Sequence, residues 1–126
     1  MKSFVALAAC MSMLFISTGA SAQDAAMAVG ELQQICLGSS AESKAACRFY
    51  ILGISQGITL GMSIADGKTQ GGRPCVPENI SSAALELVVK MKIGEDLMVF
   101  PDDRKLEASG FVGAVFIKSF PCRKPR

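Results

Sequence analysis

Residues 42–65 have the sequence ESKAACRFYILGISQGITLGMSIA, the longest helical pattern in the chain. Apolar side chains recur there every three or four residues, so they fall on one face of an α-helix. No charged residue occurs from Phe49 to Ala65. We therefore expect one long, largely buried helix at the centre of the fold. Its predicted inner face consists of Cys47, Ile51, Ile54, Ile58, Met62 and Ala65.

Three glycines, Gly53, Gly57 and Gly61, stand four residues apart in this helix. Their spacing leaves a groove without side chains, where another helix can approach closely. A glycine inside a helix costs about 1 kcal/mol relative to alanine, so three of them indicate a packing requirement. The second helix could belong to the same subunit or to a second copy of the chain.

The same glycine spacing occurs in membrane-spanning helices, which is the alternative interpretation of residues 49–65. A span needs about 20 apolar residues, and this uncharged run is at the short limit. Polar residues also group on one side of the helix, which favours a helix of a water-soluble domain. These polar residues are Ser55, Gln56, Thr59 and Ser63.

Shorter helical patterns lie on both sides of the long helix. One spans about residues 25–36, with apolar positions at Val29, Leu32, Ile35 and Cys36. Another starts at Ser81 or Ser82, whose hydroxyl can cap it, and runs to about Ile93, where Gly94 should end it. The inner face of this helix is expected to contain Ile80, Ala84, Leu87, Val88 and Met91.

A last helix is expected to start at Pro101, because proline is tolerated in a first turn. The carboxylates of Asp102 and Asp103 would complement the helix dipole there. The sequence thus predicts an all-α fold, a small four-helix domain. The apolar stripe of the last helix would contain Leu106, Gly110, Gly113, Phe116, Ile117 and Phe120, up to Pro121 and Cys122.

The N-terminal residues 1–22 have the pattern of a cleavable signal peptide. Lys2 is followed by an apolar run from Phe4 to Ile16 and by small residues that end in Ala-x-Ala at Ala22. We expect cleavage after Ala22, a single mature domain over residues 23–126, and a periplasmic location. A membrane anchor and a lipoprotein modified at Cys10 are weaker alternatives.

Four cysteines remain after removal of the signal: Cys36, Cys47, Cys75 and Cys122. An even number in a small exported domain is typical of disulfides. The first two flank the turn between the first helices, and the last two flank the third and fourth helices. Antiparallel helix pairs therefore predict the disulfides Cys36–Cys47 and Cys75–Cys122. A metal site is disfavoured, since the chain has no histidine and no Cys-x-x-Cys.

The charge balance and the motifs argue against several function classes. With 13 Lys and Arg against 11 Asp and Glu, the chain lacks the strong positive charge of a nucleic-acid-binding protein. No nucleophile with a base, phosphate-binding loop or cofactor motif is present. The carboxylate pairs Glu95-Asp96 and Asp102-Asp103 fit helix starts and solvent-facing charge better than catalysis. We expect neither enzymatic activity nor a cofactor.

Four landmarks occur in order along the chain: Cys47-x-x-Tyr50-x-x-Gly53, Cys75-Val76-Pro77, Phe100-Pro101 and Phe120-Pro121-Cys122. Together they resemble the Rap/Tai immunity proteins of type VI secretion systems. The resemblance implies a small periplasmic all-helical protein, commonly a homodimer, that binds and blocks a Tae-type peptidoglycan amidase. The chain departs from the family at Gln56, often acidic there, and at Asp102-Asp103-Arg104, where a histidine is usual.

The resemblance implies inhibition by a loop that enters the amidase cleft. The segment 66–79, held by Cys75, and the connection 94–103 are the candidates; both could also be plain connecting loops. A periplasmic chaperone or stress-binding module is the alternative function, and a small enzyme a third. The candidate partner-binding residues are Asp66, Lys68, Arg73, Glu78, Glu95, Asp96, Asp102 and Arg104.

Overall fold

The computed structural model describes residues 26–64 and 73–122. Within these ranges the chain forms four α-helices and one short 3₁₀ helix, and no strand. The expected all-α, four-helix architecture is confirmed. Residues 1–22, predicted to be the signal peptide, lie outside the described residues. The helices are α1 (Val29–Leu37), α2 (Ala41–Ile64), α3 (Ser82–Val99), η1 (Pro101–Lys105) and α4 (Ala108–Ser119).

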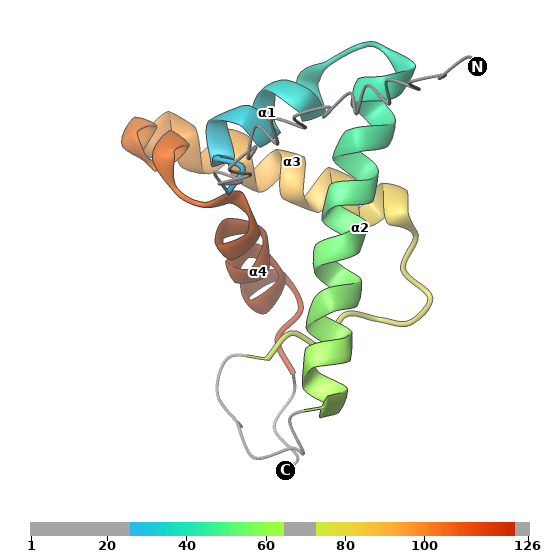
Figure 1. Ribbon diagram of the computed structural model, residues 1–126. Helices are drawn as coiled ribbons and strands as arrows, with labels where there is room; N and C mark the ends of the chain where they lie inside the picture. Colours follow the sequence, from blue (N-terminus) through green and yellow to red (C-terminus); the bar gives the residue numbers. More distant parts are fainter. Residues whose placement is uncertain (1–25, 65–72, 123–126) are drawn as a thin grey trace, which may run out of the picture.

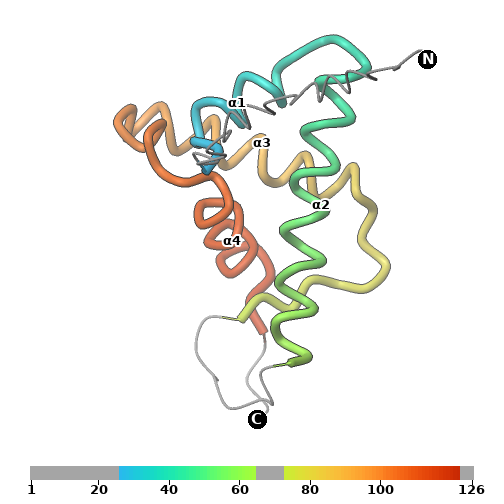
Figure 2. Tube along the Cα trace, viewed as in Figure 1, coloured from blue at the N-terminus to red at the C-terminus, as the bar shows by residue number. Residues whose placement is uncertain are grey.

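The long helix α2 is the element against which the others are arranged (Figure 1). Helix α1 lies across its upper end, α3 crosses behind it, and α4 packs beside it below α1. After α3 the chain turns back through η1 before α4 begins, as the tube in Figure 2 shows. η1 lies in contact with both α1 and α3.

Each α-helix buries one face in a common core. Phe116 of α4 is the largest fully buried side chain, and it belongs to a core cluster to which all four helices contribute. Burial of such a side chain contributes roughly 1.5–3 kcal/mol, so the core holds the four helices together. The core residues are Val29, Leu32, Cys36, Cys47, Ile51, Leu85, Val89, Ile93, Leu97, Ala108, Val112, Val115 and Phe116.

Both predicted disulfides, Cys36–Cys47 and Cys75–Cys122, are present. The first joins the end of α1 to the second turn of α2. The second joins the segment before α3 to the segment that follows α4, where the Cys75 amide also donates to the Phe120 carbonyl oxygen at 2.7 Å. By the chain-entropy estimate such cross-links contribute about 3 and 4 kcal/mol, before any strain.

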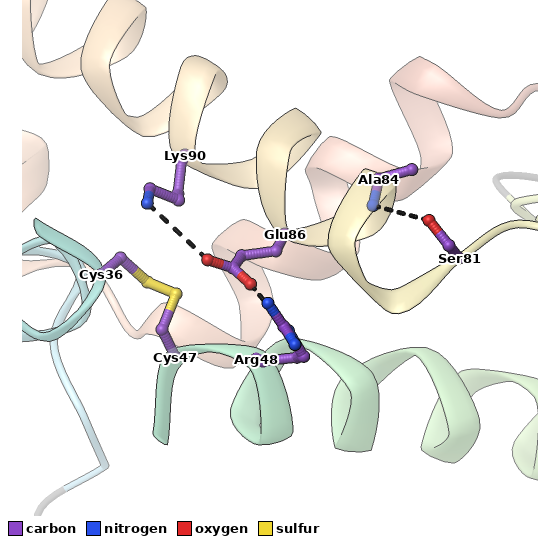
Figure 3. Close-up of polar contacts among 7 residues, drawn as sticks. All are labelled: Cys36, Cys47, Arg48, Ser81, Ala84, Glu86 and Lys90. Carbon is purple, nitrogen blue, oxygen red and sulfur yellow. Dashed lines mark hydrogen bonds and ion pairs between the residues drawn. A yellow bond between two sulfur atoms is a disulfide. The ribbon is translucent and has the colours of Figure 1, made fainter. Parts of the chain in front are cut away.

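An ion pair ties α2 to α3 next to the first disulfide (Figure 3). Arg48 Nε donates to Glu86 Oε2 at 3.0 Å, and Lys90 Nζ lies 3.7 Å from Glu86 Oε1. Glu86 is only 9% exposed, and these two cations offset the cost of burying its carboxylate. At the start of the same helix, the Ser81 hydroxyl accepts a hydrogen bond from the Ala84 amide at 3.1 Å. The predicted Ser81 cap is thus confirmed.

Helix α3 differs from the prediction in its length and its inner face. It continues through Gly94 to Val99, because the buried stripe of Ile93 and Leu97 extends past the glycine. The expectation that Gly94 ends the helix is therefore wrong: packing outweighs the low helix propensity of one glycine. Leu87 and Met91, assigned to the inner face, are 58% and 52% exposed. The observed face is Leu85, Glu86, Val89, Ile93 and Leu97.

The fourth helix begins later than predicted. Pro101 opens the short helix η1, and α4 starts only at Ala108. The residues between them are bonded to the start of α1: the Val29 amide donates to the Leu106 carbonyl at 2.9 Å, and the Ala108 amide to the Met27 carbonyl at 2.8 Å. These bonds hold residue 107 extended and interrupt the helix. Of the predicted stripe, Phe116 is buried, Phe120 packs at the edge, and Leu106 is exposed.

Within residues 26–64 and 73–122, no helix combines the length and the apolar character needed to cross a membrane.

Two glycine substitutions test the helix assignments. A side chain at Gly94 would meet no atom within 4 Å, so Gly94→Ala should stabilise the domain by up to about 1 kcal/mol through helix propensity alone. In contrast, a Cβ at Gly38 would lie 2.5 Å from Ser43 Cβ, so Gly38→Ala should destabilise it. Urea unfolding measures both. A Gly94→Ala variant less stable than the wild type would contradict a continuous α3.

Candidate functional site

The second half of α3, η1 and α4 line a partly open cavity of about 620 Å³, which we call the α3–α4 pocket. Helix α3 contributes Lys92, Glu95, Asp96 and Val99, and α4 contributes Phe111, Ala114, Val115 and Lys118. Both sets have the spacing i, i+3, i+4, i+7, which places each set on one face of its helix. The pocket is therefore the space between two facing helix surfaces, closed at one end by η1.

Two carboxyl groups meet in this pocket. Asp96 of α3 lies beside Asp103 of η1, close enough for a hydrogen bond when one of them carries a proton. Oδ2 of Asp96 is buried and has no hydrogen-bond partner among the described residues. Burial raises the pKa of Asp96, and the Asp103 charge and hydrogen bond raise it further, whereas Lys118 of α4 opposes the shift.

The remaining charges of the pocket lie at its rim. Lys92 Nζ is 2.6 Å from Glu95 Oε2, so these two side chains balance each other. The carboxyl groups of Asp96 and Asp103 therefore face only the single positive charge of Lys118. No group of three possible metal ligands occurs among the described residues, so these carboxylates do not form a candidate metal site.

The family model of the Rap1a immunity proteins matches residues 28–122. The chain belongs to this family. The match runs from Ala28, the residue before α1, to the last cysteine, and so includes every helix and the α3–α4 pocket. Immunity proteins neutralise a protein effector by binding it, so a protein partner is expected to contact this domain. Searches of curated proteins and of solved structures gave no match.

The structure places the predicted partner-binding residues of this Rap1a immunity protein in three regions. Glu95 and Asp96 are helical residues of the pocket, not residues of a loop as predicted from the connection 94–103. Asp102 and Arg104 are exposed on η1, outside the pocket. The remaining four do not line the pocket: Arg73 and Glu78 precede α3, and Asp66 and Lys68 lie outside the described residues.

Nine of the eleven residues that line the pocket were not among the predicted site residues, and they include Asp103, Phe111 and Lys118. Asp103 fits the pattern of a helix-start carboxylate, and Phe111 and Lys118 fit an ordinary amphipathic helix. The signal that could have found them is the matching i, i+3, i+4, i+7 spacing in residues 92–99 and 111–118. This spacing predicts a shared pocket only when the two helices are known to face each other.

The second candidate surface of this Rap1a immunity protein is the outer face of α2. Gly53, Gly57 and Gly61 are exposed, and a Cβ at any of them would meet no atom within 4 Å. Within the described residues no other helix packs on this glycine ridge. Large apolar side chains flank the ridge with high exposure: Phe49 (69%), Leu60 (61%) and Ile64 (72%). Packing of the ridge against a second copy stays a prediction.

The raised pKa of Asp96 predicts a pH-dependent stability. Folding raises this pKa, so the native state retains a proton over a range in which the unfolded chain, with an aspartate pKa of about 3.9, has lost it. The free energy of unfolding therefore decreases as the pH rises from the unfolded pKa to the native pKa of Asp96, and it stays lower above that pH. Asp96→Asn, which cannot ionise, should gain stability relative to the wild type between about pH 4 and neutral pH.

Urea unfolding at a series of pH values measures this difference. The control is Asp102→Asn, a neighbouring carboxylate that is exposed on η1. A difference between Asp96→Asn and the wild type that stays constant with pH would contradict the burial of this carboxyl group.

Proposed function

We propose that this Rap1a immunity protein is a periplasmic inhibitor of a peptidoglycan amidase effector delivered by a type VI secretion system. The family supports an immunity protein that binds an effector. The exported location is supported by the signal-peptide pattern and by two disulfides, which persist in an oxidising compartment. A cell-wall amidase acts in that same compartment, where an inhibitor must meet it.

The proposed mechanism is occlusion of the amidase cleft, without any turnover by the immunity protein. The observation that carries it is the exposed charged segment η1, which is held rigidly by contacts with α1 and α3. A segment that is already ordered loses less entropy when it binds. Asp102 and Arg104 are exposed on η1. Residues 73–78 provide a second constrained segment, because Cys75 within it is bonded to Cys122.

The proposal includes a homodimer formed through the outer face of α2. A dimer with twofold symmetry brings the same surface of both copies together, so one helix with a small-residue ridge can cross its equivalent at Gly57. The ridge is uncharged and its flanking residues Phe49, Leu60 and Ile64 are exposed in the single subunit. Pairing would remove this apolar surface from water.

The alternative is a periplasmic chaperone or stress-binding module. The exposed apolar residues of α2 are the observation in its favour, since a chaperone binds many clients through such surface. A chaperone should bind an apolar dye and lose its dimer on acidification. An immunity protein should instead bind one partner tightly at neutral pH.

Charge reversal tests the occlusion mechanism. Asp102→Lys combined with Arg104→Glu should abolish inhibition of a neighbouring-gene amidase, because both side chains contact the enzyme in the proposed mechanism. The assay is release of peptides from peptidoglycan. The same measurement on charge-reversal variants of Arg73 and Glu78 tests the second segment, and variants of Asp66 and Lys68 extend the test to the residues before it. Lys44→Glu, on the first turn of α2, is the matched control. Full inhibition by every variant would contradict occlusion by these two segments.

Leucine in the glycine ridge tests the dimer. A Cβ at Gly57 would meet no atom within 4 Å, and the residue is exposed, so Gly57→Leu should fold yet prevent close approach of a second copy. Light scattering after size-exclusion chromatography should show a dimer for the wild type and a monomer for the variant. Gly110→Leu, at an equally open glycine of α4, should remain a dimer. A wild-type monomer, or a Gly57→Leu dimer, would contradict the interface.

A further inference from the structure

The α3–α4 pocket contains one buried oxygen atom to which no described residue donates a hydrogen bond. Its volume of about 620 Å³ lies within the range of protein sites that receive a ligand group, roughly 300–1,000 Å³. Oδ2 of Asp96 is buried at this pocket without a hydrogen-bond partner among the described residues. Leaving a buried acceptor without a donor is unfavourable, so a ligand that brings a donor would gain this interaction on binding.

The charges that face Asp96 favour a positively charged ligand. On α3, Glu95 is already bonded to Lys92 at 2.6 Å. On η1, Asp103 adds a second carboxyl group beside Asp96, and on α4 only Lys118 opposes them. Among the described residues, two carboxyl groups thus face one ammonium group. When both carboxyl groups are ionised, one negative charge remains that a bound cation could balance.

The walls of the pocket suit the stem of a long basic side chain. Phe111 and Val115 of α4 line the cavity, and Phe100, at its rim, is 57% exposed. The methylene groups of arginine and lysine pack on apolar surface while their charged ends reach polar groups. An arginine can also stack its guanidinium on an aromatic ring.

We propose that the α3–α4 pocket binds a basic side chain, preferably arginine, presented by the protein effector. The planar guanidinium has several donors in a fixed fork, so it can bond to the carboxyl groups of Asp96 and Asp103 together. The pocket would then anchor one residue of the effector while η1, next to it, contacts the enzyme surface. For the identity of the partner, though not for the chemistry of the pocket, this inference rests on the proposed function.

The test uses a small probe and does not require the effector. N-acetyl-arginine amide is titrated into the protein purified from the periplasm, and NMR follows the Val115 methyls, the Phe111 ring and the Asp96 carboxyl carbon. We expect saturable shifts at these three residues. The uncharged analogue N-acetyl-citrulline amide should bind at least tenfold more weakly. Equal shifts with both probes, or shifts only at other residues, would overturn the proposal.

Two variants distinguish the contribution of the Asp96 carboxyl group to probe binding from that of the pocket's shape. Asp96→Asn should lower the affinity for the arginine probe at least tenfold. Asp102→Asn, outside the pocket on η1, should bind the probe like the wild type. Unchanged binding by Asp96→Asn would count against the proposed contact. A protein that binds the probe selectively but inhibits no amidase would leave the pocket standing and refute the proposed function. A protein that inhibits an amidase but does not bind the arginine probe would support the proposed function and refute the pocket proposal.

Discussion

The arrangement of this domain depends on two backbone hydrogen bonds between residues 27–29 and residues 106–108. They hold residue 107 extended, so the chain cannot continue as a helix from Pro101 to α4. The intervening segment forms η1 and packs on α1, where a Cβ at Gly30 would lie 3.3 Å from Arg104 Cβ. With η1 in this position, Asp103 lies beside Asp96 of α3, and both carboxyl groups line the pocket between α3 and α4.

Covalent and ionic contacts hold the other helices in place around this arrangement. The Cys36–Cys47 disulfide and the Arg48–Glu86 ion pair fix α1 and α3 against the first turns of α2. At the other end, Cys75–Cys122 joins the segments that flank α3 and α4. The outer face of α2 is not used by any of these contacts, and its glycine ridge and flanking apolar residues are exposed.

The sequence was sufficient for the features that depend on local pattern. The all-α class, the position of α2, the Ser81 cap and both disulfide pairs follow from helical periodicity and from which helices are neighbours along the chain. The errors all involve contacts between distant residues. Gly94 does not end α3 because Leu97 has a place in the core, and Pro101 does not start α4 because residues 106–108 bond to α1. The Asp96–Asp103 pair could not be predicted for the same reason, since it requires the position of η1.

The domain combines a rigid charged segment, a pocket with an unsatisfied carboxyl group and an exposed helix face, all within the region matched by the Rap1a immunity family. These features suit a protein that acts by binding. The most direct test of the proposed function is isothermal titration calorimetry of the disulfide-bonded protein against a peptidoglycan amidase encoded beside its gene, at neutral pH. The account predicts tight, saturable binding with one effector per subunit and loss of amidase activity at that ratio. No binding, or weak binding that leaves the amidase fully active, would contradict it.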